Sequence, residues 1–309
     1  MTPTGAEPFH FADTLIRRVR ELGHPLCVGL DPHLPMIPPL FRRGSMRPGD
    51  PETAQAVRDF VFAVVDRLEG RTAVVKPQSA FYEQLGPAGV TVLSDVMRRA
   101  RERGLLVLLD AKRGDIGSTA DAYARAYLEP DAPMAAEALT VNPYLGLDSL
   151  DPFVTRARDH GRGVFVLVRT SNKGAGDLQD LEVEGGPVFH ALARALAPLA
   201  EELRGGATGW SSLGIVLGAT WPAQASAVRE LLPHALVLVP GYGAQGGGAA
   251  DSVASFVPGP SGLEGGVVSS SRGTLFPEGS DTEDASAWEA AIDAGLDRAI
   301  EELGSAVSR

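Results

Sequence analysis

Short apolar runs alternate with longer amphipathic stretches along almost the whole chain. Apolar runs of about 4–8 residues that end in glycine, proline or polar residues are typical of buried strands, and apolar positions at helical spacing are typical of helices. The pattern predicts strands at residues 26–30, 73–76, 105–110, 138–142, 163–168, 214–217, 236–239 and 266–269. It predicts helices at residues 52–68, 89–103, 118–128, 149–160, 188–203, 222–232, 249–256 and 288–303.

The order of these elements predicts the fold class. Eight strands that are each followed by a helix are what a (β/α)8 TIM barrel requires, whereas an open doubly wound sheet usually stops at about five or six strands. We therefore expect one α/β barrel domain over residues 1–309. Loop insertions without obvious structure are expected near residues 38–51, 172–187 and 258–265. The segment 172–187 is a candidate lid, because it is rich in proline, glycine and acidic residues.

Composition narrows the classes of partner. The formal net charge is −11 and no basic tract offsets it, so we expect no nucleic-acid partner. The single cysteine, Cys27, excludes an internal disulfide and offers no zinc-type spacing, which favours a reducing compartment. No apolar run reaches about 18 residues and no signal sequence begins the chain. We therefore expect a soluble cytoplasmic protein that does not associate with membranes.

Charged residues gather where two predicted strands end. Asp110, Lys112 and Asp115 follow the apolar run 105–109, and Lys76 ends another run. If the extended geometry continues, Asp110 and Lys112 share a strand face, because side chains alternate with period two. These residues could form a structural ion-pair network. Burying an unpaired charge at a barrel mouth costs roughly several kcal/mol of stability, so charges placed there are expected to pair. They could also form a proton-transfer array, in which a lysine that stays protonated between carboxylates donates to a forming carbanion.

Loops after the expected seventh and eighth strands indicate a phosphate site. The first, residues 240–248, is rich in glycine, and the second contains Arg272 beside Gly273. An ordinary strand-to-helix turn would also explain the glycines. In barrels of this class, however, these loops bind phosphate through backbone N–H groups, and arginine adds a planar fork of donors. Asp31, at the end of the first strand, is either a turn residue or an acceptor for sugar hydroxyls.

Several of these motifs together resemble the orotidine 5′-phosphate decarboxylase family, in its longer bacterial (type 2) subgroup. The signature is Asp110-x-Lys112-x-x-Asp115-Ile116-Gly-x-Thr119, with support from Ser171-Asn-Lys-Gly, Pro240-Gly-x-Gly-Ala-Gln245-Gly-Gly and Arg272-Gly273. The likeness covers about residues 25–276. It implies a ribulose-phosphate-binding type of (β/α)8 barrel that converts orotidine 5′-phosphate to uridine 5′-phosphate. This reaction is the last step of de novo UMP synthesis, and the resemblance implies no cofactor and no metal.

The resemblance also implies roles for the charged residues. Lys112 would protonate C6 of the pyrimidine as carbon dioxide leaves, so the reaction would pass through a C6 carbanion. Asp110 and Asp115 would flank Lys112, and Lys76 would complete the alternating array of charges. The enzyme would be a homodimer with shared active sites, because Asp115 and Thr119 would enter the site of the neighbouring subunit.

Contacts to the rest of the substrate are implied in the same way. Asp31 and Lys76 would contact the ribose hydroxyls, and Ser171 would bond the amide edge of the pyrimidine. The phosphate would be held by side chains and backbone of the last two loops, namely Gln245, Arg272 and Gly243. Apart from a second copy of the chain, orotidine 5′-phosphate is the one partner that the resemblance implies.

Two other functions stay open on the residues alone. A keto-sugar phosphate decarboxylase or aldol-type synthase of the same superfamily would use a divalent metal. The six histidines show no metal-ligand spacing, but Asp110 and Asp115 could hold a metal ion. A non-catalytic phosphosugar-binding barrel could retain the pocket as a sensor, although binding alone does not require so costly an array of charges. Metal-free turnover of orotidine 5′-phosphate distinguishes the decarboxylase from both.

Overall fold

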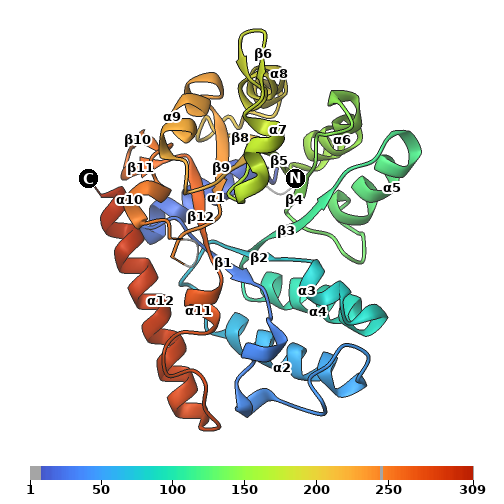
Figure 1. Cartoon of the computed structure of the whole chain (residues 1–309), viewed down its shortest axis with the longest axis vertical. Helices are drawn as coiled ribbons and strands as arrows, with labels where there is room; N and C mark the ends of the chain where they lie inside the picture. Colours follow the sequence, from blue (N-terminus) through green and yellow to red (C-terminus); the bar gives the residue numbers. More distant parts are fainter. Residues whose placement is uncertain (1–7, 244–245, 309) are drawn as a thin grey trace, which may run out of the picture.

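The computed structural model describes residues 8–243 and 246–308, which contain a closed barrel of parallel strands (Figure 1). Neighbouring strands follow the order β1-β12-β9-β8-β5-β4-β3-β2. Their bounds are β1 Leu26–Leu30, β2 Val74–Pro77, β3 Leu106–Arg113, β4 Ala138–Val141, β5 Gly163–Arg169, β8 Ser211–Leu217, β9 Ala235–Val239 and β12 Gly266–Ser270. Each coincides with one of the eight predicted strands, so the predicted (β/α)8 class is confirmed.

The barrel strands are almost wholly apolar because both of their faces are covered. In β3, Leu106 and Leu108 belong to the cluster that fills the barrel, whereas Val107 and Leu109 belong to the cluster beneath the helices. Burial on both faces explains why such strands appear in the sequence as continuous apolar runs. At Gly214 a Cβ atom would lie 2.4 Å from the ring of Phe165, so the bulky interior ring depends on a glycine in the neighbouring strand.

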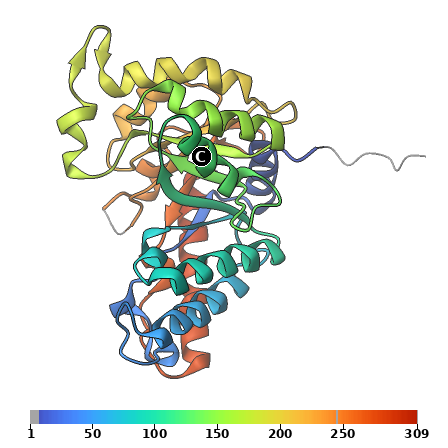
Figure 2. The same ribbon diagram turned by 90° about the vertical axis from the view of Figure 1, so that its right-hand side faces the viewer.

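Helices surround the barrel on its outer face (Figures 1 and 2). The long ones are α2 Pro51–Asp66, α4 Gly86–Glu102, α5 Gly117–Leu128, α6 Asp151–His160, α8 Val188–Glu202, α9 Pro222–Leu231 and α12 Ala285–Val307. The helix predicted over 249–256 is shorter than expected. It is the single turn α10, Ala249–Ser252, because the chain turns after Ser252 and enters β10 at Val257. No helix in the described residues is long and apolar enough to cross a membrane.

Helix α1, Phe11–Leu22, is absent from the predicted elements. Its apolar residues Phe11, Leu15 and Ile16 join the cluster that fills the barrel, and Phe11 meets Phe165 edge-on at 6.0 Å between ring centroids. The helix therefore closes the amino-terminal end of the barrel. The amphipathic spacing of this helix is present in the sequence. It is missed because the predicted helices are only those that follow a strand, whereas α1 precedes the first strand.

Two of the three predicted insertions contain more structure than expected. Residues 172–187 form the turns η4 Lys173–Ala175 and α7 Gly176–Gln179, then the hairpin of β6 Glu182–Val183 with β7 Gly186–Pro187. Residues 257–264 form the hairpin of β10 Val257–Gly259 with β11 Gly262–Glu264. Glycines with positive φ, such as Gly185 at 86°, permit the tight turns. Residues 38–51 contain the short turn η2, Pro39–Phe41. Figure 2 shows the β6–β7 hairpin projecting away from the barrel.

Arg229, near the end of α9, is a buried cation that donates hydrogen bonds to backbone carbonyls. It is 7% exposed and lies 5.0 Å from the ring centroid of Trp210. Burial lowers the pKa of its guanidinium to about 10. The guanidinium donates to five carbonyl oxygens, those of Ser255, Leu232, Pro233, Ala235 and Gly265. Arg229 therefore fastens α9 to the segments that enter β9, β10 and β12.

Replacing Arg229 with methionine should lower the free energy of unfolding by about 3 kcal/mol or more, because several buried carbonyls lose their donor. Urea denaturation followed by circular dichroism measures the change. Arg98→Met is the matched control, since the Arg98 side chain is 57% exposed and pairs with Asp95 on the surface. The control should lose less than about 1 kcal/mol. Equal losses in the two variants would contradict the anchoring role of Arg229.

Candidate active site

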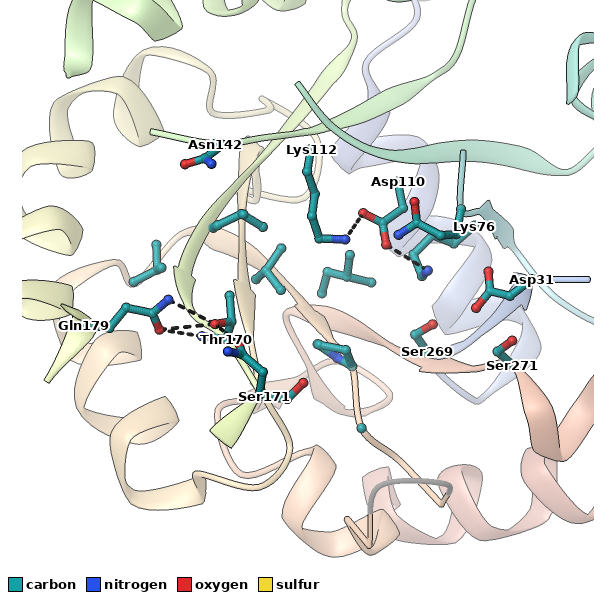
Figure 3. Close-up of a pocket in the computed structure, with 18 of the residues that line it drawn as sticks. Asp31, Lys76, Asp110, Lys112, Asn142, Thr170, Ser171, Gln179, Ser269 and Ser271 are labelled. Atoms are coloured by element: carbon teal, nitrogen blue, oxygen red, sulfur yellow. Dashed lines mark hydrogen bonds and ion pairs between the residues drawn. The ribbon is translucent and has the colours of Figure 1, made fainter. Parts of the chain in front are cut away.

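A pocket of about 1000 Å³ opens at the carboxyl ends of the barrel strands. Its floor includes the apolar side chains of Leu167, Val216 and Leu238, which belong to the barrel interior or pack against it. Its walls combine polar side chains with apolar ones such as Phe81, Phe189 and Leu192. Figure 3 shows a charged side and a neutral side, formed respectively by Asp31, Lys76, Asp110 and Lys112 and by Asn142, Thr170, Ser171 and Gln179.

Asp110 is the centre of the charged side. Its Oδ2 lies 3.1 Å from Nζ of Lys76 and its Oδ1 lies 2.6 Å from Nζ of Lys112. Burial alone would raise the pKa of the Asp110 carboxyl, but the two ammonium groups outweigh burial and hold that pKa well below its usual range. Burial would lower the pKa of Lys76, but Asp110 and Asp31 outweigh it and raise that pKa above its usual value. Asp110 and Lys76 are therefore both ionised at neutral pH.

Lys112 reaches Asp110 by a geometry that strand alternation does not predict. Its φ is 48°, in the left-handed region that costs a residue with a side chain about 1–2 kcal/mol. The register between β3 and β4 also shifts between Leu109 and Arg113. Extended geometry, the condition for Asp110 and Lys112 to share a strand face by alternation, therefore does not continue through Lys112. The two side chains meet because the backbone bends at Lys112.

Thr140, on β4, stabilises this bend. Its Oγ1 accepts a hydrogen bond from the backbone N–H of Lys112 at 2.9 Å and donates one to Oδ1 of Asp110, also at 2.9 Å. The Thr140 side chain is fully buried, so water does not compete for either bond. Thr140 therefore fixes the position of the Lys112 backbone relative to the Asp110 carboxylate.

Asp31 and Ser271 border the charged array at the ends of β1 and β12. Within the described residues, Oδ1 of Asp31 and Oγ of Ser271 are both buried without a hydrogen-bond partner. Unpartnered buried oxygens are costly and are uncommon away from functional sites. The two strand ends approach closely, because a Cβ atom on Gly29 would lie 2.8 Å from Cβ of Ser271. This corner of the pocket offers oxygens to a polar ligand.

The neutral side is formed by the end of β5 and by the insertion at 172–187. Ser171 lies in the pocket wall as predicted, and Gln179 lines the pocket beside it. Oε1 of Gln179 accepts a hydrogen bond from the backbone N–H of Thr170 at 2.9 Å, and its Nε2 donates to Oγ1 of Thr170 at 3.0 Å. Asn142 completes this side from the end of β4.

Of the three predicted phosphate residues, Arg272 lies in the third part of the pocket. Arg272 begins α11, Arg272–Leu275, and lines the pocket together with Gly241 and Tyr242. Gly243 follows these residues, but its backbone N–H donates to the carbonyl of Gly247 at 2.9 Å and it is not part of the pocket lining. Gln245 lies outside the described residues.

Like Gly243, the predicted residues Asp115 and Thr119 are not brought to the chain's own pocket. Neither is part of the lining. Oδ1 of Asp115 accepts the backbone N–H of Ile116 at 2.8 Å, and Thr119 is exposed on α5. Among the described residues, no group of three or more histidine, cysteine, aspartate or glutamate side chains is placed to hold a metal ion.

Four further pocket or supporting residues escape the analysis of strand ends. Thr140 is an ordinary hydroxyl inside an apolar strand, and Gln179 belongs to an insertion, so neither has a sequence signal of its own. Gln78 and His33 each lie two residues after a predicted polar position, Lys76 and Asp31, and both line the pocket. Gln78 and His33 would be found by also considering the residue two positions after each polar residue at a strand end.

Comparison with known proteins places this geometry in a family. Residues 24–270 match the model of the orotidine 5′-phosphate decarboxylase / HUMPS family. The orotidine 5′-phosphate decarboxylase of Rhodopirellula baltica is 43% identical over 301 residues, which are 95% of this chain and 98% of that protein. That of Deinococcus radiodurans is 42% identical over 91% of this chain and 92% of its own. The solved structure of Leishmania donovani OMP decarboxylase is 31% identical with a TM-score of 0.74, covering 97% of this chain and 100% of that one. The chain therefore belongs to the orotidine 5′-phosphate decarboxylase family.

Proposed function

We propose that this chain decarboxylates orotidine 5′-phosphate in the barrel pocket without a cofactor, and that Lys112 donates the proton that replaces carbon dioxide. Family membership makes the protein a carboxy-lyase that forms uridine 5′-phosphate in the last step of UMP synthesis. The observation that supports the proposed chemistry is the array of Lys76, Asp110 and Lys112, which is hydrogen-bonded within the pocket.

Each part of the substrate has a wall that suits it. Asp31, with an unpartnered buried oxygen, and Lys76 suit the ribose hydroxyls. Arg272 suits the phosphate, together with the loop 240–248, to which Gln245 and Gly243 belong. The base then lies on the apolar floor with its amide edge toward Ser171. This orientation directs C6 toward Lys112.

The charged side can lower the barrier by electrostatics. Loss of carbon dioxide leaves a carbanion at C6, and enzymes typically lower barriers by about 8–23 kcal/mol. An ionised Asp110 repels the substrate carboxylate before the reaction, and this repulsion disappears as carbon dioxide leaves. Protonated Lys112 stabilises the carbanion and then donates to it. Because Thr140 and Lys76 already hold these groups, little reorganisation accompanies the reaction.

Asp115 and Thr119 act, in this proposal, in the site of a second subunit. They lie beside an exposed apolar surface that includes Ile116, 58% exposed, and Tyr144, 74% exposed, with Leu145 close by in the chain. Exposed apolar surface of this kind marks protein interfaces. A two-fold dimer through this surface would bring Asp115 toward the partner's pocket mouth, next to the Tyr144 that lines it.

The expected cytoplasmic location stays a prediction.

Replacing Lys112 with alanine should lower turnover of orotidine 5′-phosphate by about 100- to 10,000-fold, because the proton donor is lost. Ultraviolet absorbance in the presence of EDTA measures turnover. Calorimetric binding of uridine 5′-phosphate serves as the control for folding and should change by less than about tenfold. Turnover within tenfold of the wild type would refute the role of Lys112. Wild-type activity that EDTA abolishes would favour the metal-dependent rival.

Thr140→Val should lower kcat by about 10- to 100-fold, because valine keeps the shape but loses both hydrogen bonds, one of them to a charged group. Thr140→Ser is the matched control, because it retains the hydroxyl, and it should stay within a few-fold of the wild type. The KM for orotidine 5′-phosphate should change little in both variants, since Thr140 positions the charged array and does not reach the ligand. Equal kcat values for the valine and serine variants would contradict this role.

Mixing Lys112→Ala and Asp115→Ala chains should restore activity if the site is shared. In a mixed dimer one site carries both lesions and the other carries neither. Random reassortment makes about half of the dimers mixed, so roughly a quarter of all sites should recover. Co-expression with two different tags and tandem purification isolates mixed dimers for the measurement. If both residues served their own chain's site, confirmed mixed dimers would stay as inactive as the parents.

A further inference from the structure

Arg169 is a buried charge that the proposed chemistry does not use. It ends β5, is 1% exposed and is the largest of the fully buried side chains among the described residues. Placing a guanidinium in such a position is unfavourable unless partners compensate for the lost hydration. Arg169 has such partners. Its Nη2 donates to Oδ2 of Asp180 at 2.9 Å, its Nη1 donates to the carbonyl of Thr170 at 3.0 Å, and its guanidinium lies 4.4 Å from the ring centroid of Trp221.

These contacts fasten the insertion at 172–187 to the barrel. Asp180 belongs to the insertion, and the residue before it, Gln179, is hydrogen-bonded to Thr170 by both its amide oxygen and its amide nitrogen. Arg169 ends β5 and Thr170 follows it, so two adjacent residues at the end of this strand hold two adjacent residues of the insertion. The chain between them, 171–178, is a loop pinned at both ends along the edge of the pocket.

The hydrogen bonds also fix which way the Gln179 amide faces. The backbone N–H of Thr170 can only donate, so it must meet the amide oxygen of Gln179 and not its nitrogen. The amide nitrogen carries two N–H groups and uses one of them for Oγ1 of Thr170. One N–H donor therefore remains on a residue that lines the pocket beside Ser171, on the side opposite Asp110 (Figure 3).

We propose that Gln179 is a further substrate-binding residue, which donates its remaining N–H to a carbonyl oxygen of the pyrimidine, and that the Arg169–Asp180 ion pair positions it. The inference rests on the proposed function, because it takes the ligand to be a pyrimidine nucleotide. The chemistry fits, since the amide edge of a pyrimidine carries carbonyl acceptors and Ser171 alone offers a single hydroxyl donor. Arg169 and Asp180 are positioning residues, because they act through Gln179.

Gln179→Glu separates the contact with the ligand from the contact with Thr170. A glutamate oxygen still accepts from the Thr170 N–H, but the carboxylate has no N–H for the pyrimidine and repels its carbonyl oxygen. We expect uridine 5′-phosphate to bind about tenfold more weakly or worse by calorimetry. Ribose 5-phosphate, which lacks the base, should bind within about twofold of wild type, and it controls for folding and for the added charge. Equal weakening of both ligands, or of neither, would overturn the role of Gln179.

Asp180→Asn tests the positioning pair. It removes the charge that faces Arg169 and should raise the KM for orotidine 5′-phosphate by about tenfold, with a smaller change in kcat. Asp177→Asn is the matched control, because Asp177 is an exposed carboxylate on the same insertion, and it should leave both constants unchanged. Asp180→Asn combined with Gln179→Glu should cost less than the product of the two separate effects, because both act through one contact. Equal effects of Asp180→Asn and Asp177→Asn would overturn the positioning role.

The two levels of the proposal fail in different ways. If the wild-type protein does not turn over orotidine 5′-phosphate, the proposed function is wrong, whatever the variants do. If the wild type turns it over and Gln179→Glu binds uridine 5′-phosphate as tightly as the wild type, only the inference about Gln179 is wrong. The binding measurements need no turnover, so the second result does not depend on the first.

Discussion

The site depends on a carboxylate that is almost fully buried and lies between two ammonium groups. Asp110 is 7% exposed, and its two oxygens contact Lys76 and Lys112 respectively. Either lysine alone would leave one oxygen without an ionic partner in a poorly solvated place. The three side chains come from β2 and β3. Their relative positions are fixed by the pairing of those two strands and by Thr140 on β4. Closure of the barrel is thus a condition for the array, because it excludes water on every side but the mouth.

The same arrangement reconciles an anionic substrate with a chain whose net charge is −11. Long-range attraction cannot bring a phosphate to such a protein, so positive charge must be concentrated at the site. Lys76, Lys112 and Arg272 all line the same pocket, although the chain contains only 28 lysines and arginines in total. Asp110 and Asp31 also raise the pKa of Lys76, which keeps this buried lysine ionised. The local field, and not the net charge, therefore determines what the pocket can bind.

The sequence predicts the barrel well because buried parallel strands and amphipathic helices leave different periods in it. It also predicts which strand ends carry polar residues, and Asp31, Lys76, Asp110 and Ser171 all line the pocket. It does not predict how Lys112 reaches Asp110, because a left-handed residue and a shifted register leave no periodic signal. Thr140 and Gln179 are missed for a related reason: a partner that is defined by a contact across strands or loops has no local pattern. Asp115 and Thr119 are not part of the lining of the chain's own pocket, so the contacts of a single subunit give them no role.

The two sides of the pocket are held in position by different forces. The charged side belongs to the sheet, whose strands are fixed by burial on both faces. The neutral side belongs partly to an insertion with little core of its own, since Leu178, Leu181 and Val183 are 48%, 52% and 46% exposed. A hairpin of two-residue strands contributes little stability alone. The position of Gln179 therefore depends on a few directional contacts to Arg169 and Thr170. Loss of those contacts would move the neutral side while the charged side stayed in place, so recognition of the base and the chemistry at C6 can fail separately.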